Sequence, residues 1–242
     1  MNNYEILAIV PARSGSKSIP QKNIKLLARK PLIAYTIEEA KKSKYISRIV
    51  VSTDSEQIAE IAKNLGVEVP FLRPKELAED NVQDLPVFKH ALEWLKNKEG
   101  YTPDVIVHLR PTAPLRKSKH IDKGIKILIE HPEADSVRSV YPAPKHPLKM
   151  WKIEDGYLVP FIPEEAYNIK EAYNYPRQKL PPAYVQNGSV DVIRTKTILE
   201  KNSMSGDKIL PFIMDEMDSV SIDTIVEFEL AEVLMEKKKT ES

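Results

Sequence analysis

Short apolar runs alternate with amphipathic stretches along the first 140 residues of the chain. The runs at 6–10 and 49–51 are unbroken and hydrophobic, and the run at 105–109 is interrupted only by His108, as in strands buried on both faces of a parallel sheet. Between them, apolar residues recur every three or four positions, for example in 58–65 and 85–95, as on the buried face of a helix. The pattern predicts an α/β fold with a Rossmann-like, mostly parallel sheet and helices on both of its faces.

The alternation stops after residue 140, where prolines become frequent. Asp155-Gly156 lies between two short apolar segments and is a signal for a β-hairpin. An isolated hairpin is marginally stable in water and needs a surface to pack on. We therefore expect an α/β core formed by 1–140 and 187–242, with 141–186 inserted as a Pro-rich hairpin arm.

Two polar segments next to predicted strands, 54–57 and 187–188, are interpreted as a helix cap and a turn. Either Asp54 or Ser55 can cap the helix that follows the second strand, and Gln57 completes a capping box for Asp54. We therefore favour a capping role for Asp54. Asn187-Gly188 is interpreted as a turn that leads from the arm into the next core strand.

Composition narrows the possible classes of protein. The chain has 242 residues, of which 42% are hydrophobic and 29% charged, with a net charge of +1, which fits one large domain or a domain with an insertion. A near-neutral charge argues against bulk nucleic-acid binding, and no apolar run approaches the roughly 20 residues of a membrane span. With no cysteine and no signal-peptide pattern, a cytoplasmic protein without disulfides is the expectation.

The loop after the first strand, residues 11–23, differs sharply from the strand. It contains the cations Arg13, Lys17 and Lys22 and three serines, Ser16 among them, and it has no acidic residue. Open α/β sheets bind ligands at the carboxyl ends of their strands, and cations, hydroxyls and amides gathered there suit a triphosphate. The loop matches neither the P-loop nor the G-x-G-x-x-G pattern. The alternative interpretation is a solvated basic loop.

At these residues the chain resembles a known family. Residues 12–23, Ala-Arg-Ser-Gly-Ser-Lys-Ser-Ile-Pro-Gln-Lys-Asn, are similar to the nucleotide-binding loop of the acylneuraminate cytidylyltransferases, the CMP-sialic acid synthetases. Residues 109–116 resemble the L-x-P-T-S-P-L-R signature of the same family. Segments 146–149 and 175–181 resemble its dimerisation arm, so the resemblance covers nearly the whole chain.

The resemblance implies cytidylyl transfer. The anomeric hydroxyl of a nonulosonic, sialic-acid-like sugar would attack the α-phosphate of CTP, and pyrophosphate would leave. The partners implied are CTP, an acidic nine-carbon sugar and a second copy of the chain, whose arm would reach over the active site. Two alternatives stay open: a nucleotidyltransferase that acts on a sugar 1-phosphate or a Kdo-like acid, and a non-catalytic nucleotide-binding or assembly protein.

The resemblance also implies roles for individual residues. The expected nucleotide-binding residues are Arg13, Ser16, Lys17, Asn23 and Arg73, and the expected catalytic residues are Lys22, Arg177 and Asp223.

Asp223 is also the implied ligand of Mg²⁺. The family has Asp-x-Asp-Thr at this point, whereas this chain has Ser221 in place of the first acid. A hydroxyl is a weaker Mg²⁺ ligand than a carboxylate, but one carboxylate together with phosphate oxygens can suffice. The alternative is that Asp223 is a second cap beside a capping box formed by Thr224 and Glu227.

Arg110 stands at the end of a buried strand, where the sialic acid enzymes have glutamine. A buried guanidinium is costly unless an anion meets it, and that anion is a substrate carboxylate, a phosphate or an acid of the protein. In the first case Arg110 binds substrate and shifts preference from N-acetylneuraminate towards a legionaminic- or pseudaminic-type acid. In the last case it forms a salt bridge that leaves specificity unchanged.

Overall fold

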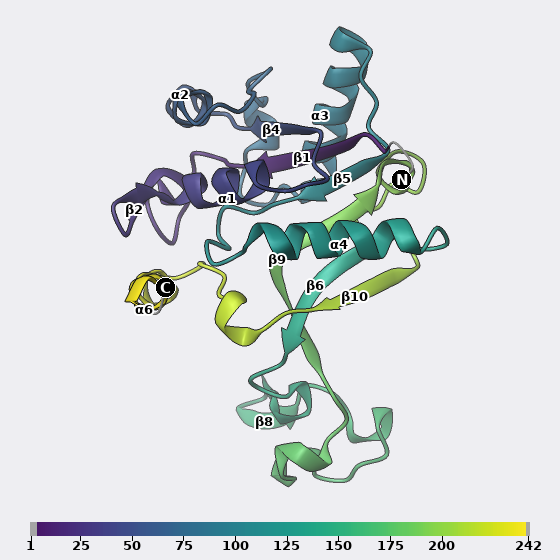
Figure 1. Ribbon diagram of the computed structural model, residues 1–242. Helices are drawn as coiled ribbons and strands as arrows, with labels where there is room; N and C mark the ends of the chain where they lie inside the picture. Colours follow the sequence, from purple (N-terminus) through teal and green to yellow (C-terminus); the bar gives the residue numbers. More distant parts are fainter. Residues whose placement is uncertain (1–3, 241–242) are drawn as a thin grey trace.

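The computed structural model describes residues 4–240, and a six-stranded sheet forms its centre (Figure 1). The strand order is β10-β6-β9-β5-β1-β4. The bounds are β1 (Ile6–Pro11), β4 (Arg48–Ser52), β5 (Val105–His108), β6 (Ser136–Pro142), β9 (Tyr184–Arg194) and β10 (Ile209–Ile213). The ends of the predicted core range, residues 1–3 and 241–242, lie outside the described part of the chain.

The direction of the strands confirms a mostly parallel sheet. β1 runs parallel to β4 and β5, and β10 runs parallel to β6, whereas β9 is antiparallel to both β5 and β6. A small two-stranded sheet of β2 (Leu26–Leu27) and β3 (Lys30–Pro31) follows the 11–23 loop. The parallel strands therefore present their carboxyl ends, with that loop, at one edge of the sheet.

Helices cover both faces of the sheet, as the alternating pattern predicts. The helices are α1 (Leu32–Lys41), α2 (Glu56–Asn64), α3 (Asp84–Glu99), α4 (Ser118–Glu130), α5 (Thr195–Leu199) and α6 (Ile225–Thr240). Ala8 of β1 packs in one core cluster with side chains from α1, α2 and α4, while Ile9 packs in a second cluster with α3 and α5. Among residues 4–240, no helix combines the length and apolar character needed to cross a membrane.

α6 packs against the loop side of the core rather than against a sheet face. Phe228 and Leu234 of α6 share a buried cluster with Ile19 of the 11–23 loop and Leu32 of α1. This packing brings the residues that precede α6, including Asp223, towards the loop that follows β1.

The 141–186 segment extends away from the sheet, at the bottom of Figure 1. β7 (Trp151–Glu154) pairs with β8 (Tyr157–Pro160) in an antiparallel hairpin, and Leu148, Ala172 and Leu180 form a small cluster of their own. The outer ends of β6 and β9 pair at Tyr141 with Val185 and so connect this segment to the core. Several large apolar side chains of the hairpin are exposed, namely Ile153, Tyr157, Leu158 and Phe161. Its role in dimerisation stays a prediction.

Asn187-Gly188 is not the turn that the sequence suggested, because both residues lie within the continuous strand β9. The pairing of β9 with β6 shifts register between Arg138 and Val140, and Gly188 has a φ of 63°. A glycine is suited to this positive φ, which lets the strand bulge instead of ending. The side chain of Asn187 is buried and accepts a hydrogen bond from the Ser139 hydroxyl at 2.6 Å.

Asp135, buried just before β6, holds the segment that leads into β10. Its Oδ2 accepts hydrogen bonds from the backbone N–H of Asp207 at 2.9 Å and of Lys208 at 3.1 Å. The Lys201 ammonium also donates to this oxygen at 2.8 Å. Lys201, followed by the backbone donors, holds the pKa of the Asp135 carboxyl well below its ordinary value.

This pKa shift predicts a pH-dependent contribution to stability. Because the folded-state pKa is lowered, the contribution is complete above the unfolded-state pKa of about 3.9 and is lost as the pH falls towards the folded value. Asp135→Asn is therefore expected to lower the free energy of unfolding at pH 7, and its difference from wild type to narrow below about pH 4. Urea unfolding from pH 7 to pH 2.5 measures this, with the exposed Glu133→Gln as control. A difference that is independent of pH would contradict it.

Candidate active site

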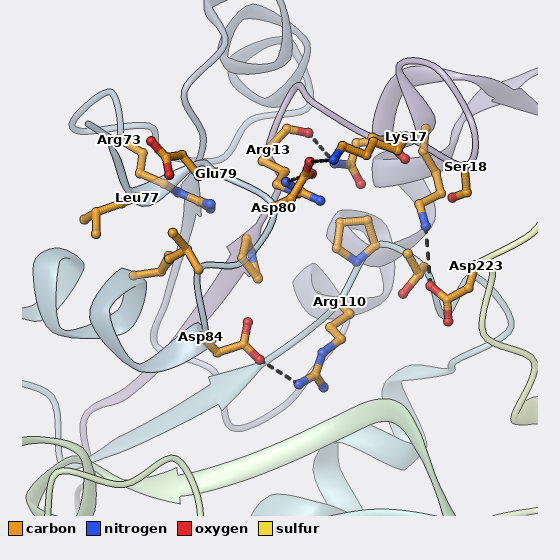
Figure 2. Close-up of a pocket in the computed structure, with 18 of the residues that line it drawn as sticks. Arg13, Lys17, Ser18, Arg73, Leu77, Glu79, Asp80, Asp84, Arg110 and Asp223 are labelled. Carbon is orange, nitrogen blue, oxygen red and sulfur yellow. Dashed lines mark hydrogen bonds and ion pairs between the residues drawn. The ribbon is translucent and has the colours of Figure 1, made fainter. Parts of the chain in front are cut away.

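A cavity of about 560 Å³ opens where β1 and β5 end (Figure 2). Its lining includes seven of the predicted site residues: Arg13, Ser16, Lys17, Lys22, Asn23, Arg73 and Asp223. Arg110 also lines it, whereas Arg177 does not. The expected position at the carboxyl ends of parallel strands therefore agrees with the structure.

Arg13 and Lys17 converge in this cavity on one acid, Asp80. Arg13 Nη1 lies 2.6 Å from Asp80 Oδ1, and Lys17 Nζ lies 2.5 Å from Asp80 Oδ2. Hydrogen bonds from Lys17 and then Arg13 lower the pKa of the Asp80 carboxyl. The cationic loop thus has a balancing acid, which comes from the 73–83 segment and not from the loop itself.

Asp54 acts on the loop and does not cap α2, contrary to the sequence interpretation. Its Oδ1 accepts the backbone N–H of Ser14 at 2.9 Å, and its Oδ2 accepts the Ser14 hydroxyl at 2.5 Å. Ser55 is the N-cap, because its hydroxyl accepts the backbone N–H of Ile58 at 3.3 Å. The carboxylate at the end of β4 therefore fixes the loop that follows β1.

Asn23 and Lys22 connect the same loop to its surroundings. The Asn23 side-chain amide donates to the backbone carbonyl of Arg13 at 2.8 Å. The Lys22 ammonium donates to the carbonyl of Ile222 at 2.9 Å and lies 3.5 Å from Asp223 Oδ1. Because the Lys22 side chain is only 12% exposed, its charge is confined to this corner of the cavity.

Arg73 is buried in the wall of the cavity rather than exposed to solvent. Its guanidinium donates to the carbonyl oxygen of Ser52 at 2.5 Å and to the Ser52 hydroxyl at 3.1 Å. Burial lowers the pKa of Arg73 to about 10, so the side chain stays charged at neutral pH. The residue supports the end of β4 and also supplies positive charge to the cavity wall.

Asp223 is held next to Lys22 by the segment that enters α6. The backbone N–H of Ile222 donates to the Thr112 carbonyl at 2.8 Å, which ties this segment to the loop after β5. The predicted capping box is confirmed: Glu227 Oε2 accepts the Thr224 N–H at 2.7 Å, and the Glu227 N–H donates to the Thr224 hydroxyl at 3.3 Å. Because Thr224 and Glu227 form the cap, the Asp223 carboxylate, 74% exposed, is left facing the cavity.

A Mg²⁺ ion at the Asp223 carboxylate would need further ligands that the protein does not supply there. Within the described residues, no three His, Cys, Asp or Glu side chains form a group that could hold a metal ion by themselves. One exposed carboxylate suits Mg²⁺, which keeps several waters and takes its remaining ligands from phosphates. The donor set at Asp223 therefore fits a nucleotide-bound Mg²⁺ and not a metal held in a protein cage.

Arg110 is bound to two acids of the protein. Its Nη1 lies 2.9 Å from Asp191 Oδ2 and its Nη2 lies 2.9 Å from Asp84 Oδ2. Burial lowers the pKa of Arg110, but the charges of Asp191 and Asp84 outweigh it and raise the pKa above its ordinary value. Of the anions that the sequence left open for Arg110, the protein carboxylates are the ones in contact. Its role in substrate binding stays a prediction.

Arg177 is the one predicted site residue that does not line the cavity of its own chain. It is exposed in the arm, where its guanidinium donates to the Ala143 carbonyl at 2.7 Å. The prediction that this arginine lies near the reacting groups does not hold within a single chain, because its segment is outside the sheet edge that forms the cavity. A contribution of Arg177 to catalysis requires the arm of a second copy.

Among the residues that sequence reasoning missed are Asp80, Asp84 and His108, which line the cavity, and Asp191, which is paired with Arg110. Asp84 begins α3 and Asp191 lies in β9, so neither is near the cationic loop in sequence. His108 is buried at the end of β5. Asp191 lies between Val190 and Val192, and an acid between two apolar residues of a strand is a signal that could have indicated a buried ion pair.

Comparisons with known proteins agree with this geometry. The family described as "Cytidylyltransferase" matches residues 7–205. The chain is 36% identical to the CMP-N,N'-diacetyllegionaminic acid synthase of Legionella pneumophila, over 96% of each chain. It is 35% identical to the N-acylneuraminate cytidylyltransferase of Escherichia coli, over 97% of this chain and 53% of that protein.

Among solved structures, a CMP:2-keto-3-deoxy-manno-octonic acid synthetase complexed with CTP superposes with a TM-score of 0.70. The two chains share 14% of their residues, and the match covers 97% of this chain and 99% of the other. At this identity the likeness concerns the fold alone. It extends over the arm as well as the core.

Proposed function

The chain belongs to the cytidylyltransferase family, and from this premise we propose that it joins CTP to a nonulosonic acid to give the CMP-sugar and pyrophosphate. The observation that carries the proposal is the group of cations Arg13, Lys17 and Lys22 in one cavity at the carboxyl ends of β1 and β5. Relatives of similar length act on acids of this class, as the synthase of Legionella pneumophila does.

The reaction forms one bond and breaks another. The anomeric hydroxyl oxygen bonds to the α-phosphorus of CTP, the bond from that phosphorus to the bridging oxygen of the β-phosphate breaks, and the hydroxyl proton is released to water. Positioning and charge neutralisation supply most of the catalysis in transfers of this kind. Arg13 and Lys17 would hold the outer phosphates once these displace Asp80, and Lys22 would lie against the triphosphate from the Asp223 side.

We propose that Mg²⁺ accompanies the nucleotide and that Asp223 holds it. When bound, the ion would neutralise phosphate charge. The Lys22 ammonium, 3.5 Å from Asp223, would then shift towards the phosphates because both cations compete for the same carboxylate. Asn23 would keep the 11–23 loop in register by its bond to the Arg13 carbonyl.

Pyrophosphate release tests the proposed function. The purified chain is mixed with Mg²⁺, one of the four ribonucleoside triphosphates and one acceptor. The acceptors are N-acetylneuraminic acid, N,N'-diacetyllegionaminic acid, pseudaminic acid, Kdo and a sugar 1-phosphate. We expect release with CTP and at least one nine-carbon acid. Release with the sugar 1-phosphate or Kdo alone would favour the corresponding alternative, and no release with any pair would favour a non-catalytic nucleotide-binding protein.

We propose further that the active form is a homodimer in the cytoplasm, the compartment that supplies CTP. The exposed hairpin side chains Ile153, Tyr157, Leu158 and Phe161 support this, because apolar and aromatic residues gathered on an extended arm are typical of an interface. A symmetric pair of arms would also bring Arg177 to the cavity of the other copy.

If the protein is a dimer formed by the arm, substitutions in the arm should lower its mass in solution. Each chain is 27.6 kDa, so a dimer is expected at twice that mass, 2 × 27.6 = 55.2 kDa, in sedimentation equilibrium at micromolar concentration. Ile153→Asp with Leu158→Asp should give the 27.6 kDa monomer, because a buried unpaired carboxylate opposes association. Lys152→Asp, on the same strand, serves as the control for charge alone. A monomeric wild type with full activity would overturn the dimer.

A further inference from the structure

The segment that follows β4 is fixed by hydrogen bonds on both sides of Asp54. The backbone carbonyl of Thr53, a buried residue, accepts the Arg73 N–H at 2.7 Å, and the Thr53 hydroxyl accepts the Ser55 N–H at 3.1 Å. The Ser55 hydroxyl caps α2. The Asp54 carboxylate therefore projects from a fixed point of the backbone and has no part in capping the helix.

This carboxylate holds one residue of the 11–23 loop by two hydrogen bonds. Its Oδ1 accepts the Ser14 N–H at 2.9 Å, and its Oδ2 accepts the Ser14 hydroxyl at 2.5 Å. Hydrogen bonds to an ionised acceptor are roughly twice as strong as those between neutral groups. Because both oxygens are used, the backbone and the side chain of Ser14 are fixed together.

Ser14 lies outside the lining of the cavity, whereas its neighbours in the loop belong to it. Arg13 and Ser16 line the cavity, but Ser14 and Asp54 do not. A triphosphate held by Arg13 would therefore leave the contact between Ser14 and Asp54 intact. Asp80 differs in this respect, because it lines the cavity and pairs with the cations that a phosphate would take.

The end of β4 supports two parts of the candidate site. The Ser52 carbonyl accepts the Ala12 N–H at 2.9 Å and also the Arg73 guanidinium at 2.5 Å. Asp54, two positions further along the chain, holds Ser14. Arg73 and the start of the loop are thus attached to the same strand end, and Asp54 is the side chain that extends this attachment into the loop.

The attachment of the loop bears on how tightly the loop can bind a phosphate. Arg13, Lys17 and Lys22 line one cavity, and like charges gathered there oppose an ordered loop. A loop that a ligand has to order weakens binding by the conformational entropy lost, whereas a loop that is already ordered does not. Once bound, a triphosphate would itself hold the three cations. Loss of Asp54 should therefore affect the affinity for the nucleotide more than the rate of the bound complex.

The negative charge of Asp54 by itself repels a phosphate. Asp54 is only partly buried and lies outside the cavity lining, so solvent screens this repulsion, whereas its hydrogen bonds act at contact distance. Holding the loop is therefore the larger effect. Asp54→Asn separates the two effects, because it removes the charge and keeps an acceptor for the Ser14 N–H.

We propose that Asp54 is a positioning residue for the reaction, which keeps the 11–23 loop in the conformation that binds the triphosphate by holding Ser14 from outside the cavity. The inference rests on the proposed function and deepens it, because it gives a part in nucleotide binding to a side chain that touches no substrate. It also divides the serines of the loop: Ser16 and Ser18 line the cavity, whereas Ser14 belongs to the support of the loop.

Steady-state kinetics with CTP and the preferred acid of the pyrophosphate-release assay test the proposal. Asp54→Ala is expected to raise KM for CTP about tenfold, the scale of a lost hydrogen bond to a charged group, while kcat at saturating CTP and KM for the acid stay within about twofold. Asp54→Asn and Ser14→Ala, which each keep part of the contact, should raise KM for CTP about threefold, and they carry the test should Asp54→Ala not fold.

Ser55→Ala is the matched control for local structure. It removes the N-cap of α2 and should lower the melting temperature while KM for CTP stays unchanged. A rise in KM for CTP as large as that of Asp54→Ala would overturn the proposal, because any disturbance after β4 would then suffice. Ser14→Ala with Asp54→Ala should be no worse than Asp54→Ala alone, because the two residues act through one contact. A worse double variant would show that the Ser14 hydroxyl binds the nucleotide directly, against the proposal.

Hydrogen exchange and calorimetry test the same inference without an acceptor. In the free protein, the amides of residues 12–16 should exchange about tenfold faster in Asp54→Ala than in wild type, and excess CTP with Mg²⁺ should remove the difference. The dissociation constant for CTP should rise about tenfold in Asp54→Ala. Equal exchange and equal affinity in both proteins would overturn the inference while leaving cytidylyl transfer intact. No release of pyrophosphate with any acceptor would overturn the proposed function alone, because the binding of CTP still decides whether Asp54 positions the loop.

Discussion

Asp223→Asn is expected to lower CTP-dependent turnover at least ~100-fold, equivalent to about 2.7 kcal/mol, because it removes the carboxylate that we propose holds Mg²⁺ on the phosphates. Ser221 offers a hydroxyl where the family has the first acid, so position 221 supplies no second carboxylate to compensate. The measurement is turnover against Mg²⁺ concentration, together with the melting temperature. The exposed Glu229→Gln on α6 is the control.

Little change in stability is expected for the Asp223 variant, because Thr224 and Glu227 already cap α6. A variant that kept its activity and lost thermal stability would show that Asp223 has a structural role and is not a metal ligand.

The same variant tests whether Arg177 acts on the other copy. Arg177→Ala and Asp223→Asn, each inactive alone, are mixed and allowed to exchange subunits. If the site takes Arg177 from one copy and Asp223 from the other, half of the dimers are hybrids with one intact site. About a quarter of the wild-type activity should then return. No recovery after exchange would place both residues on the same chain's site.

Lys22→Ala is expected to lower turnover at least about tenfold, on the scale of one lost charge-assisted contact, roughly 1.5–3 kcal/mol. The side chain is 12% exposed and fixed between the Ile222 carbonyl and Asp223, so no other cation of the loop can take its position. Initial rates of pyrophosphate release measure the effect. Lys25→Ala is the matched control, because its ammonium lies over the Phe228 ring, 5.6 Å from the centroid. An unchanged rate for Lys22→Ala would show that the residue does not contact the triphosphate.

The parts of the fold that sequence alone predicted are those fixed by local periodicity. The apolar run of β1 has Ala8 facing one core cluster and Ile9 facing the other, which is the burial on both faces that the run indicated. The position of the cationic loop followed because parallel strands present their carboxyl ends at one edge. The prediction of a turn at Gly188 of β9 is wrong, because a positive φ occurs in a bulge as well as in a turn.

The acids of the site could not be predicted, because their partners are distant in sequence. Asp80 pairs with Arg13 across 67 positions, and Asp191 pairs with Arg110 across 81. Such pairs are set by how the strands are ordered in the sheet and not by any local pattern. The role of Arg177 is a different case, because in the proposed dimer what the arm covers would depend on a second copy of the chain.

The ion pairs of Asp80 bear on the departure of the product. Without a bound phosphate, Arg13 and Lys17 are already paired with Asp80, at 2.6 Å and 2.5 Å. An entering polyphosphate must therefore replace the ion pairs that Arg13 and Lys17 make with Asp80. Breaking these pairs reduces the net binding free energy of the polyphosphate. When pyrophosphate leaves, the Asp80 carboxylate would return to Arg13 and Lys17. Water then would not have to solvate these two cations by itself. On the proposed function, Asp80 would therefore compete with pyrophosphate for Arg13 and Lys17 and would weaken inhibition by this product.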